Sequence, residues 1–310
     1  PIPGLANGDI YQVEITGWFP RIFFDSNGDA GKILTVEQWG NIAWTSMNNA
    51  FYGCSNLTIP ATDAPNLSGV TDMSGMFRGA SSLNQNLNSW DVSSVTNMEQ
   101  LFAYATSFNQ PLNSWNVINV TNMASMFESA TTFNQPLPWD VDNVTRMDAM
   151  FSLAVAFNQD IGSWKVGQVN NMNNMFSGAN SFNQDIGSWN VGNVTNMQTM
   201  FYDTPFNQDI GGWNVSKVLT MQEMFLDAGA FNQDISAWDV KKVINMQNMF
   251  NFAGSFNQSL AAWDISSVTT MSGMLSNSNL STANYDATLI GWSTLSGGET
   301  LIPSGIALGA

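Results

Sequence analysis

The side chains of this chain that could do chemistry are mainly carboxylates and amides, because the sequence has no histidine and a single cysteine, Cys54. Without histidine, the ordinary serine and cysteine triads are absent. One cysteine forms neither an intramolecular disulfide nor a thiolate metal cluster. We therefore expect a non-catalytic protein, and glycan hydrolysis by a right-handed β-helix is the one enzymatic alternative that stays open.

One set of carboxylates recurs at the same position of a repeated sequence pattern. Like charges about 5 Å apart repel one another, so such a column needs screening, hydrogen bonds or a bound cation. The sequence leaves two interpretations open, capping of a turn or binding of calcium. The column consists of Asp160, Asp185, Asp209 and Asp234.

A second candidate calcium site lies near the N-terminus. Asp25, Asn27 and Asp29 place oxygen donors at positions 1, 3 and 5, as at the start of a calcium loop. Ile33 and Glu37 fall one residue late for an EF-hand. The alternative is a turn rich in Asp and Asn that binds no ion.

The repeat that positions these residues has a period of 24 or 25 residues. Its clearest copy runs from Phe182-Asn183-Gln184 through Trp189 to Met200-Phe201. A fixed period in this range predicts a solenoid, in which each coil buries its apolar face against its neighbours. The tryptophans that mark the period are Trp90, Trp115, Trp139, Trp164, Trp189, Trp213, Trp238 and Trp263.

Each coil shows two apolar patterns. Val169 to Ala179 has apolar residues at i, i+3, i+6, i+7 and i+10, which predicts a short helix, and Thr195 is a candidate N-cap of the next one. Trp189-Asn190-Val191 predicts a short strand, so stacked coils should form a parallel sheet. We expect the methionine and tryptophan columns to be core, and Asn183-Gln184 and its copies to form a hydrogen-bonded ladder.

The domain organisation follows from where the period begins and ends. The array is expected over residues 44–275, with an N-terminal cap over 1–43 and a C-terminal cap over 276–310. Apolar alternation between Ile10 and Phe24 predicts two short strands in the first cap. Tyr285, Leu289 and Trp292 supply apolar residues to the second, together with Ile290. The fold class is thus an α/β repeat solenoid capped at both ends.

Charge and hydropathy exclude several classes of partner. The chain has 24 acidic and 8 basic residues, a formal charge of −16, which disfavours nucleic acid and anionic membrane surfaces. No run of about 18 apolar residues is present, so we expect no membrane insertion. The chain begins at Pro1 without methionine, and we read it as part of a larger protein.

The repeat also resembles a known family. Ala50-Phe51-Tyr52-Gly53-Cys54 through Pro60 is similar to the repeat of BspA-type bacterial surface proteins, a leucine-rich-repeat variant, and the longer units resemble the related repeat of about 26 residues. The resemblance covers about residues 33–295. It implies a curved solenoid of leucine-rich-repeat type on secreted or cell-surface bacterial proteins that are commonly proposed as adhesins.

These observations predict a secreted or cell-surface module that mediates adhesion through a protein or glycan on another cell, on the matrix or on the same appendage. Near-identical positions along a rigid array suit extended, multivalent binding. The alternative is a structural spacer or filament subunit of a surface appendage. Calcium is the only cofactor considered. The candidate binding row lies between Trp and Val (or Ile) of each coil and consists of Asp91, Asn116, Asp140, Lys165, Asn190, Asn214, Asp239 and Asp264.

Overall fold

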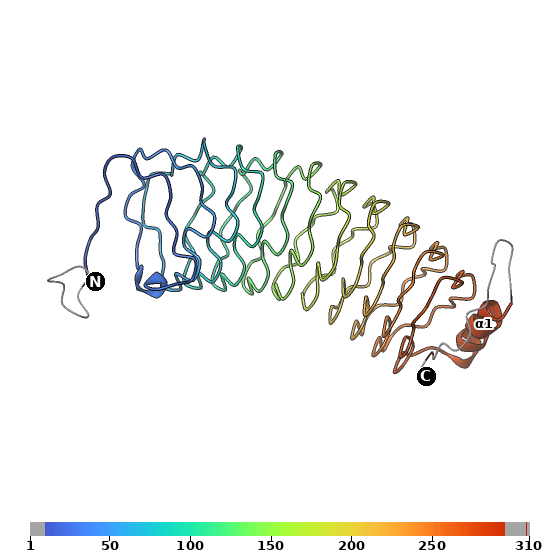
Figure 1. The fold of residues 1–310 in the computed structure, drawn as a ribbon. Coiled ribbons are helices and arrows are strands. Elements are labelled where there is room, and N and C mark those ends of the chain that lie inside the picture. Colours follow the sequence, from blue (N-terminus) through green and yellow to red (C-terminus); the bar gives the residue numbers. More distant parts are fainter. Residues whose placement is uncertain (1–9, 295–307, 309–310) are drawn as a thin grey trace.

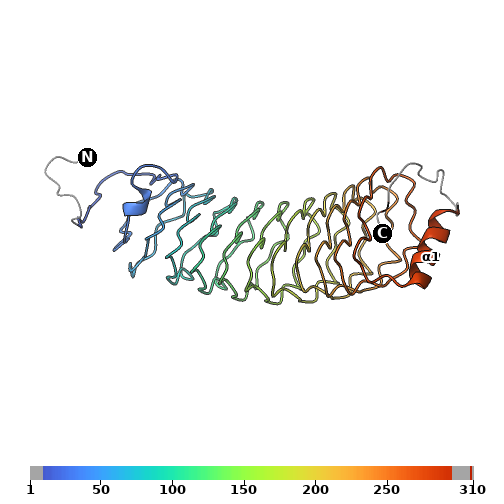
Figure 2. The ribbon, with the colours of Figure 1, turned by 90° about the horizontal axis from the view of Figure 1, so that it is seen from below.

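The computed structural model describes residues 10–294 and residue 308. The chain winds into one elongated, curved stack of coils that ends at helix α1 (Thr282–Trp292) (Figures 1 and 2). Single parallel β-bridges join consecutive coils of the array, from Asp72↔Asn97 at the start to Asn245↔Thr270 at the end. The solenoid predicted from the tryptophan period is therefore confirmed. The outermost parts of both expected caps, residues 1–9 and most of 295–310, lie outside the described residues.

The predictions of one helix and one strand in each coil are both wrong. Between residues 10 and 294 the helices are η1 (Ala30–Lys32) and α1, and no coil contains an extended strand. The segment Val169–Ala179 is mostly a run of turns, and the parallel bridge falls two residues after the buried valine of each coil, not on Trp-x-Val. Thr195 therefore caps no helix. Its hydroxyl donates instead to the carbonyl of Asn170 in the preceding coil, 3.1 Å away.

Hydrogen bonding between coils explains why turns replace the helix. The amides of Thr199 and Phe201 donate to carbonyls of the next coil, whereas the intervening amide of Met200 closes a local turn onto Met197. This alternation requires a left-handed backbone at two places per coil, and Thr199 and Asp203 have φ of 52° and 51°. An isolated helix of two or three turns is marginal in water, so bonds between coils satisfy these amides instead.

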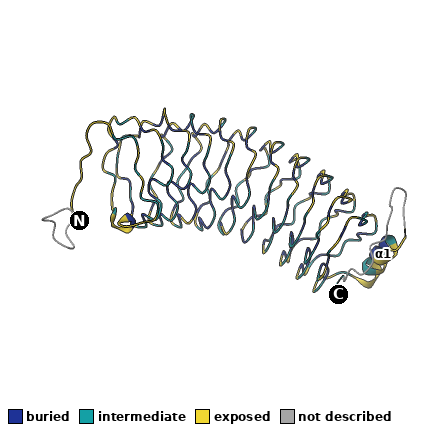
Figure 3. Ribbon diagram, in the orientation of Figure 1, coloured by how far each residue is buried: buried dark blue, intermediate teal, exposed yellow. Residues whose placement is uncertain are grey.

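The core consists of columns that run the length of the stack. Met197, Met200 and Phe201 are fully buried, and Trp189 and Val191 are at most 3% exposed, as the sequence predicts. Buried residues recur along the whole stack (Figure 3). Phenylalanine rings of successive coils stack on one another with centroids 5.5–5.9 Å apart from Phe102 to Phe250. The paired tryptophans lie 6.4–6.5 Å apart. Stacked rings therefore link each coil of the array to the next at both columns.

At the C-terminal end, helix α1 makes the contacts with the last coil that a further coil would make. From Trp115 to Trp263 each indole N–H donates to a carbonyl of the preceding coil, and Trp292 of α1 continues this pattern with a 3.0 Å bond to the carbonyl of Leu260. The amide of Asn284 donates to Asn257 as the array glutamines do to their neighbours. Leu289 and Ile290, expected to be buried in the cap, are 39% and 65% exposed.

The N-terminal end is less complete. The two strands expected between Ile10 and Phe24 are absent, and Ile10, Val13 and Trp18 are 73–86% exposed. Farther along the chain Trp39 is buried. The segment that contains Thr35 and Trp39 joins the next coil through the bridge Thr35↔Thr58. Across the described residues, no helix has the length and apolarity needed to span a bilayer.

Candidate binding surface

The predicted binding row forms one corner of the stack. In Asp91, Asn190 and Asp239 the side-chain oxygen Oδ1 accepts the backbone N–H two residues later, at 3.0–3.2 Å. This local bond closes the turn that separates the tryptophan from the buried valine. It leaves the second carboxylate oxygen of Asp, or the amide nitrogen of Asn, for other contacts. The row residues are exposed except Asp264, which is half-buried.

Charges within the row are modest. Lys165 Nζ lies 3.0 Å from Asp142 Oδ2, but the lysine side chain is 75% exposed, so this ion pair contributes little. Hydrogen bonds from the Ser93 hydroxyl and amide hold the pKa of Asp91 below its ordinary value. The row therefore presents carboxylates, amides and one ammonium, which suits polar ligands that both donate and accept hydrogen bonds.

Two open depressions lie on this row. The first has a volume of about 620 Å³ and lies between two neighbouring coils, where Trp90 and Asp91 face Ser114 and Asn116. The second, of about 380 Å³, lies farther along, where Trp164 and Lys165 face Ser188 and Asn190. The structure thus brings row residues of adjacent coils together in pairs. The serines that precede the tryptophans also line both depressions, and they were not among the predicted site residues. The recurring Ser-Trp dipeptide is the sequence signal that points to them.

The candidate calcium column is a column of turn caps. Asp160, Asp185 and Asp209 each accept the backbone N–H two residues later at 2.9 Å, and Asp234 does the same with Ser236. These carboxylates are exposed and follow one another singly along the stack. Over the part of the chain that the structure describes, no three Asp, Glu or Cys side chains gather closely enough to hold a metal ion.

The N-terminal candidate loop has local partners too. Asp25 Oδ1 accepts from the Asn49 side chain at 2.8 Å, and Asn27 donates to the Asp25 carbonyl at 2.8 Å. Asp29 pairs with Lys32 at 2.6 Å. The structure therefore favours the interpretation of a turn rich in Asp and Asn, with Asp25 in a left-handed backbone at φ 51°.

The asparagine ladder lies at another corner and is confirmed. Asn183 Oδ1 accepts from the backbone N–H of Asn207 at 2.9 Å and from the side chain of Gln208 at 3.0 Å. Asn183 donates its own amide to Asn158 in the preceding coil. The ladder satisfies turn backbone, so its residues hold the coils in register and leave the tryptophan corner as the candidate binding surface.

Comparison with known proteins gives the family of the chain. The family described as "Mycoplasma protein of unknown function, DUF285" matches at residues 45–138, 137–205 and 202–288. The chain belongs to this family, and the three matches support a repeat protein without supporting the specific resemblance to BspA-type repeats. The comparison with curated proteins found no match.

One solved structure is similar in outline. It is a leucine rich cell surface protein from Faecalibacterium prausnitzii A2-165, with 13% sequence identity over 88% of this chain and 91% of that one. The TM-score is 0.34. A superposition this loose carries no argument about the fold or function of the present chain.

Proposed function

We propose that this protein is a non-catalytic binding module that acts in adhesion at a cell surface or in the extracellular space, and that its ligand is a glycan or protein bound along the tryptophan corner. The observation that carries the proposal is the position of the two depressions. Both are lined by row residues of adjacent coils. A ligand that spans several coils meets similar groups at each one, so weak contacts add along its length.

The test is a binding screen against glycans and cell-surface proteins with two matched double variants. Asp91→Ala with Asn116→Ala removes polar groups from the larger depression. Glu99→Ala with Glu128→Ala removes two carboxylates from the Met-x-x-Met turns, which line neither depression. We expect the first variant alone to lose binding. Equal binding by both variants would refute the corner as the site.

The structural alternative, a spacer or filament subunit, is favoured by one observation. Ile10, Val13 and Trp18 expose apolar side chains at the N-terminal end of the stack, and exposed apolar groups that cluster promote association. Sedimentation of the protein and of a Trp18→Ser variant separates the two proposals. Concentration-dependent assembly that this substitution abolishes, without any ligand found in the screen, would favour the filament.

A further inference from the structure

A second surface of the stack differs in chemistry from the rest of the molecule. It consists of the residue before and the residue after each buried valine in the column from Val70 to Val268, and we call it the neutral strip. These residues point outward, because the valine between them points into the core. None of them is Asp or Glu, although the chain has 24 acidic residues, and the charged members are Lys217 and Lys242.

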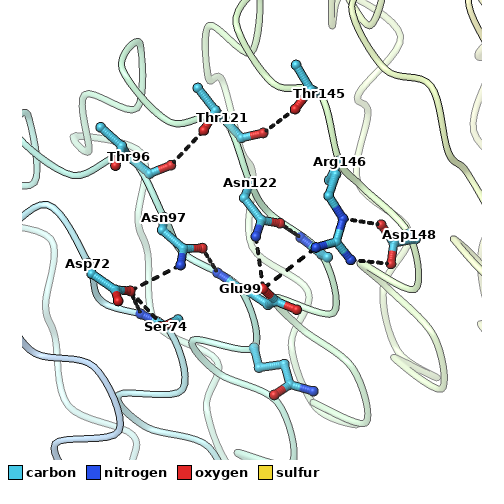
Figure 4. A network of polar contacts seen from close by, with 12 residues as sticks. Asp72, Ser74, Thr96, Asn97, Glu99, Thr121, Asn122, Thr145, Arg146 and Asp148 are labelled. Carbon is cyan, nitrogen blue, oxygen red and sulfur yellow. Dashed lines mark hydrogen bonds and ion pairs between the residues drawn. The ribbon is translucent and has the colours of Figure 1, made fainter.

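The side chains of the neutral strip are held in place by the preceding coil. The hydroxyls of Thr121 and Thr145 donate to the carbonyls of Thr96 and Thr121, at 3.3 Å and 3.1 Å (Figure 4). The side-chain amides of Asn143 and Asn193 donate to carbonyls of the coil before, at 2.8 Å and 2.7 Å. A surface whose side chains are already ordered loses less entropy when it binds.

This arrangement fixes what the strip offers to a partner. Each of these threonines donates its one hydroxyl hydrogen to a backbone carbonyl, so its oxygen can serve a ligand only as an acceptor. The side-chain amides of Asn119 and Asn143 also donate to backbone carbonyls and leave Oδ1 as an acceptor, whereas Asn193 Oδ1 already accepts from Lys217 Nζ. From Thr71 to Thr195 the strip carries no charge, and the partner that complements these coils is uncharged and rich in hydrogen-bond donors. Nearby charges are paired with one another, as Arg146 is with Asp148 at 3.0 Å (Figure 4).

The dimensions of the strip select among partners. The coils from Thr71 to Thr195, spaced about 4.8 Å apart, and outward residues about 7 Å apart give an acceptor surface of roughly 25 Å by 7 Å. That is well below the roughly 800 Å² that each partner of a stable protein complex buries. Addition of a peptide strand is unavailable as well, because the Thr121 and Thr145 amides already bind the preceding coil at 2.9 Å. A thin polymer fits where a globular protein or a β-strand does not.

From these observations we infer that the neutral strip binds an uncharged polysaccharide chain that runs along the stack, with its hydroxyls donating to the threonine and asparagine oxygens. This surface is distinct from the tryptophan corner and would serve the protein independently of the function proposed there. Affinity should rise with the length of the polymer, since successive coils from Thr71 to Thr195 repeat similar acceptors.

The experiment measures retention of the protein on amylose, microcrystalline cellulose and a neutral β-glucan, with alginate as the anionic comparison. Gln168→Glu with Asn170→Asp places two carboxylates at the centre of the strip with almost no change of shape. The control, Asn173→Asp with Gln198→Glu, adds the same charge in the Met-x-x-Met turns, where Glu99 and Asp148 occur naturally in other coils. Equal melting temperatures of the two variants establish that both are folded.

We expect at least one neutral polysaccharide to bind, and the strip variant to raise its dissociation constant by about tenfold or more, which corresponds to about 1.4 kcal/mol. The turn variant should bind as the parent does. The inference is overturned if no neutral polysaccharide is retained, if alginate alone binds, or if both variants bind equally. A protein dimer that only the strip variant disrupts would overturn it too. Loss of polysaccharide binding in Asp91→Ala with Asn116→Ala, while the strip variant binds as the parent does, would overturn it and support the function proposed for the tryptophan corner.

Discussion

Removal of one core ring should loosen the array locally. Phe176 is fully buried, and its ring centroid lies 3.9 Å from that of Phe182, 5.8 Å from that of Phe151 and 5.9 Å from that of Phe201. Truncation of a buried Phe to Ala costs about 3–5 kcal/mol. Loss of the stacked ring pair adds about 0.5–1.5 kcal/mol, which favours the upper part of that range. Phe176→Ala should therefore cost about 4–5 kcal/mol.

Hydrogen exchange is the suitable assay, because a solenoid need not unfold in one step. We expect amides of the coils around Phe176 to lose protection while those near the two ends keep most of theirs. The matched control is Phe252→Ala, since Phe252 is 54% exposed and its loss should change stability by no more than about 0.5 kcal/mol. Uniform loss of protection from end to end in Phe176→Ala would refute the reasoning, because it would show one cooperative unit.

Four further predictions concern the polar groups. Asn183→Ala should cost about 1 kcal/mol in chemical denaturation, because two donors of the next coil lose their shared acceptor; an unchanged midpoint would contradict the ladder. Burial acts to raise the pKa of Asp63, but the amides of Trp39 and Gly40 outweigh it and hold the pKa below its ordinary value, so its contribution to stability is present above about pH 4 and is lost as the pH falls through the folded pKa. In an acid titration Asp63→Asn should lack that part of the pH dependence, and a titration curve identical in shape to that of the parent would count against it. Millimolar calcium or chelator should leave the melting temperature unchanged, whereas a calcium-dependent rise that Asp185→Asn abolishes would restore the cation interpretation. Burial raises the pKa of the Cys54 thiol to about 12, so a thiol reagent should modify it only after unfolding, and rapid modification of the native protein would show that the first coils open.

The sequence by itself determined the architecture of the array. Period, column and burial agree at every coil, because a side chain that fails to face the core breaks the stacking of both neighbours. The positions of Trp189, Met197 and Phe201 in the core, and of Asn183 in a ladder, could therefore be predicted without coordinates. The candidate row was also foreseen as residues, but not as pairs lining depressions.

Only the tertiary structure decided what conformation each coil adopts. Apolar residues three apart, such as Met197 and Met200, fit one face of a helix and also fit successive turns, so the pattern alone does not separate them. Turns form because backbone amides donate to carbonyls of the next coil. These hydrogen bonds join residues about 25 positions apart, so a local sequence pattern does not reveal them. The same holds for Asp185, whose carboxylate could bind a cation or cap a turn. The geometry of its own corner, with the amide of Gly187 at 2.9 Å, supplies the cap.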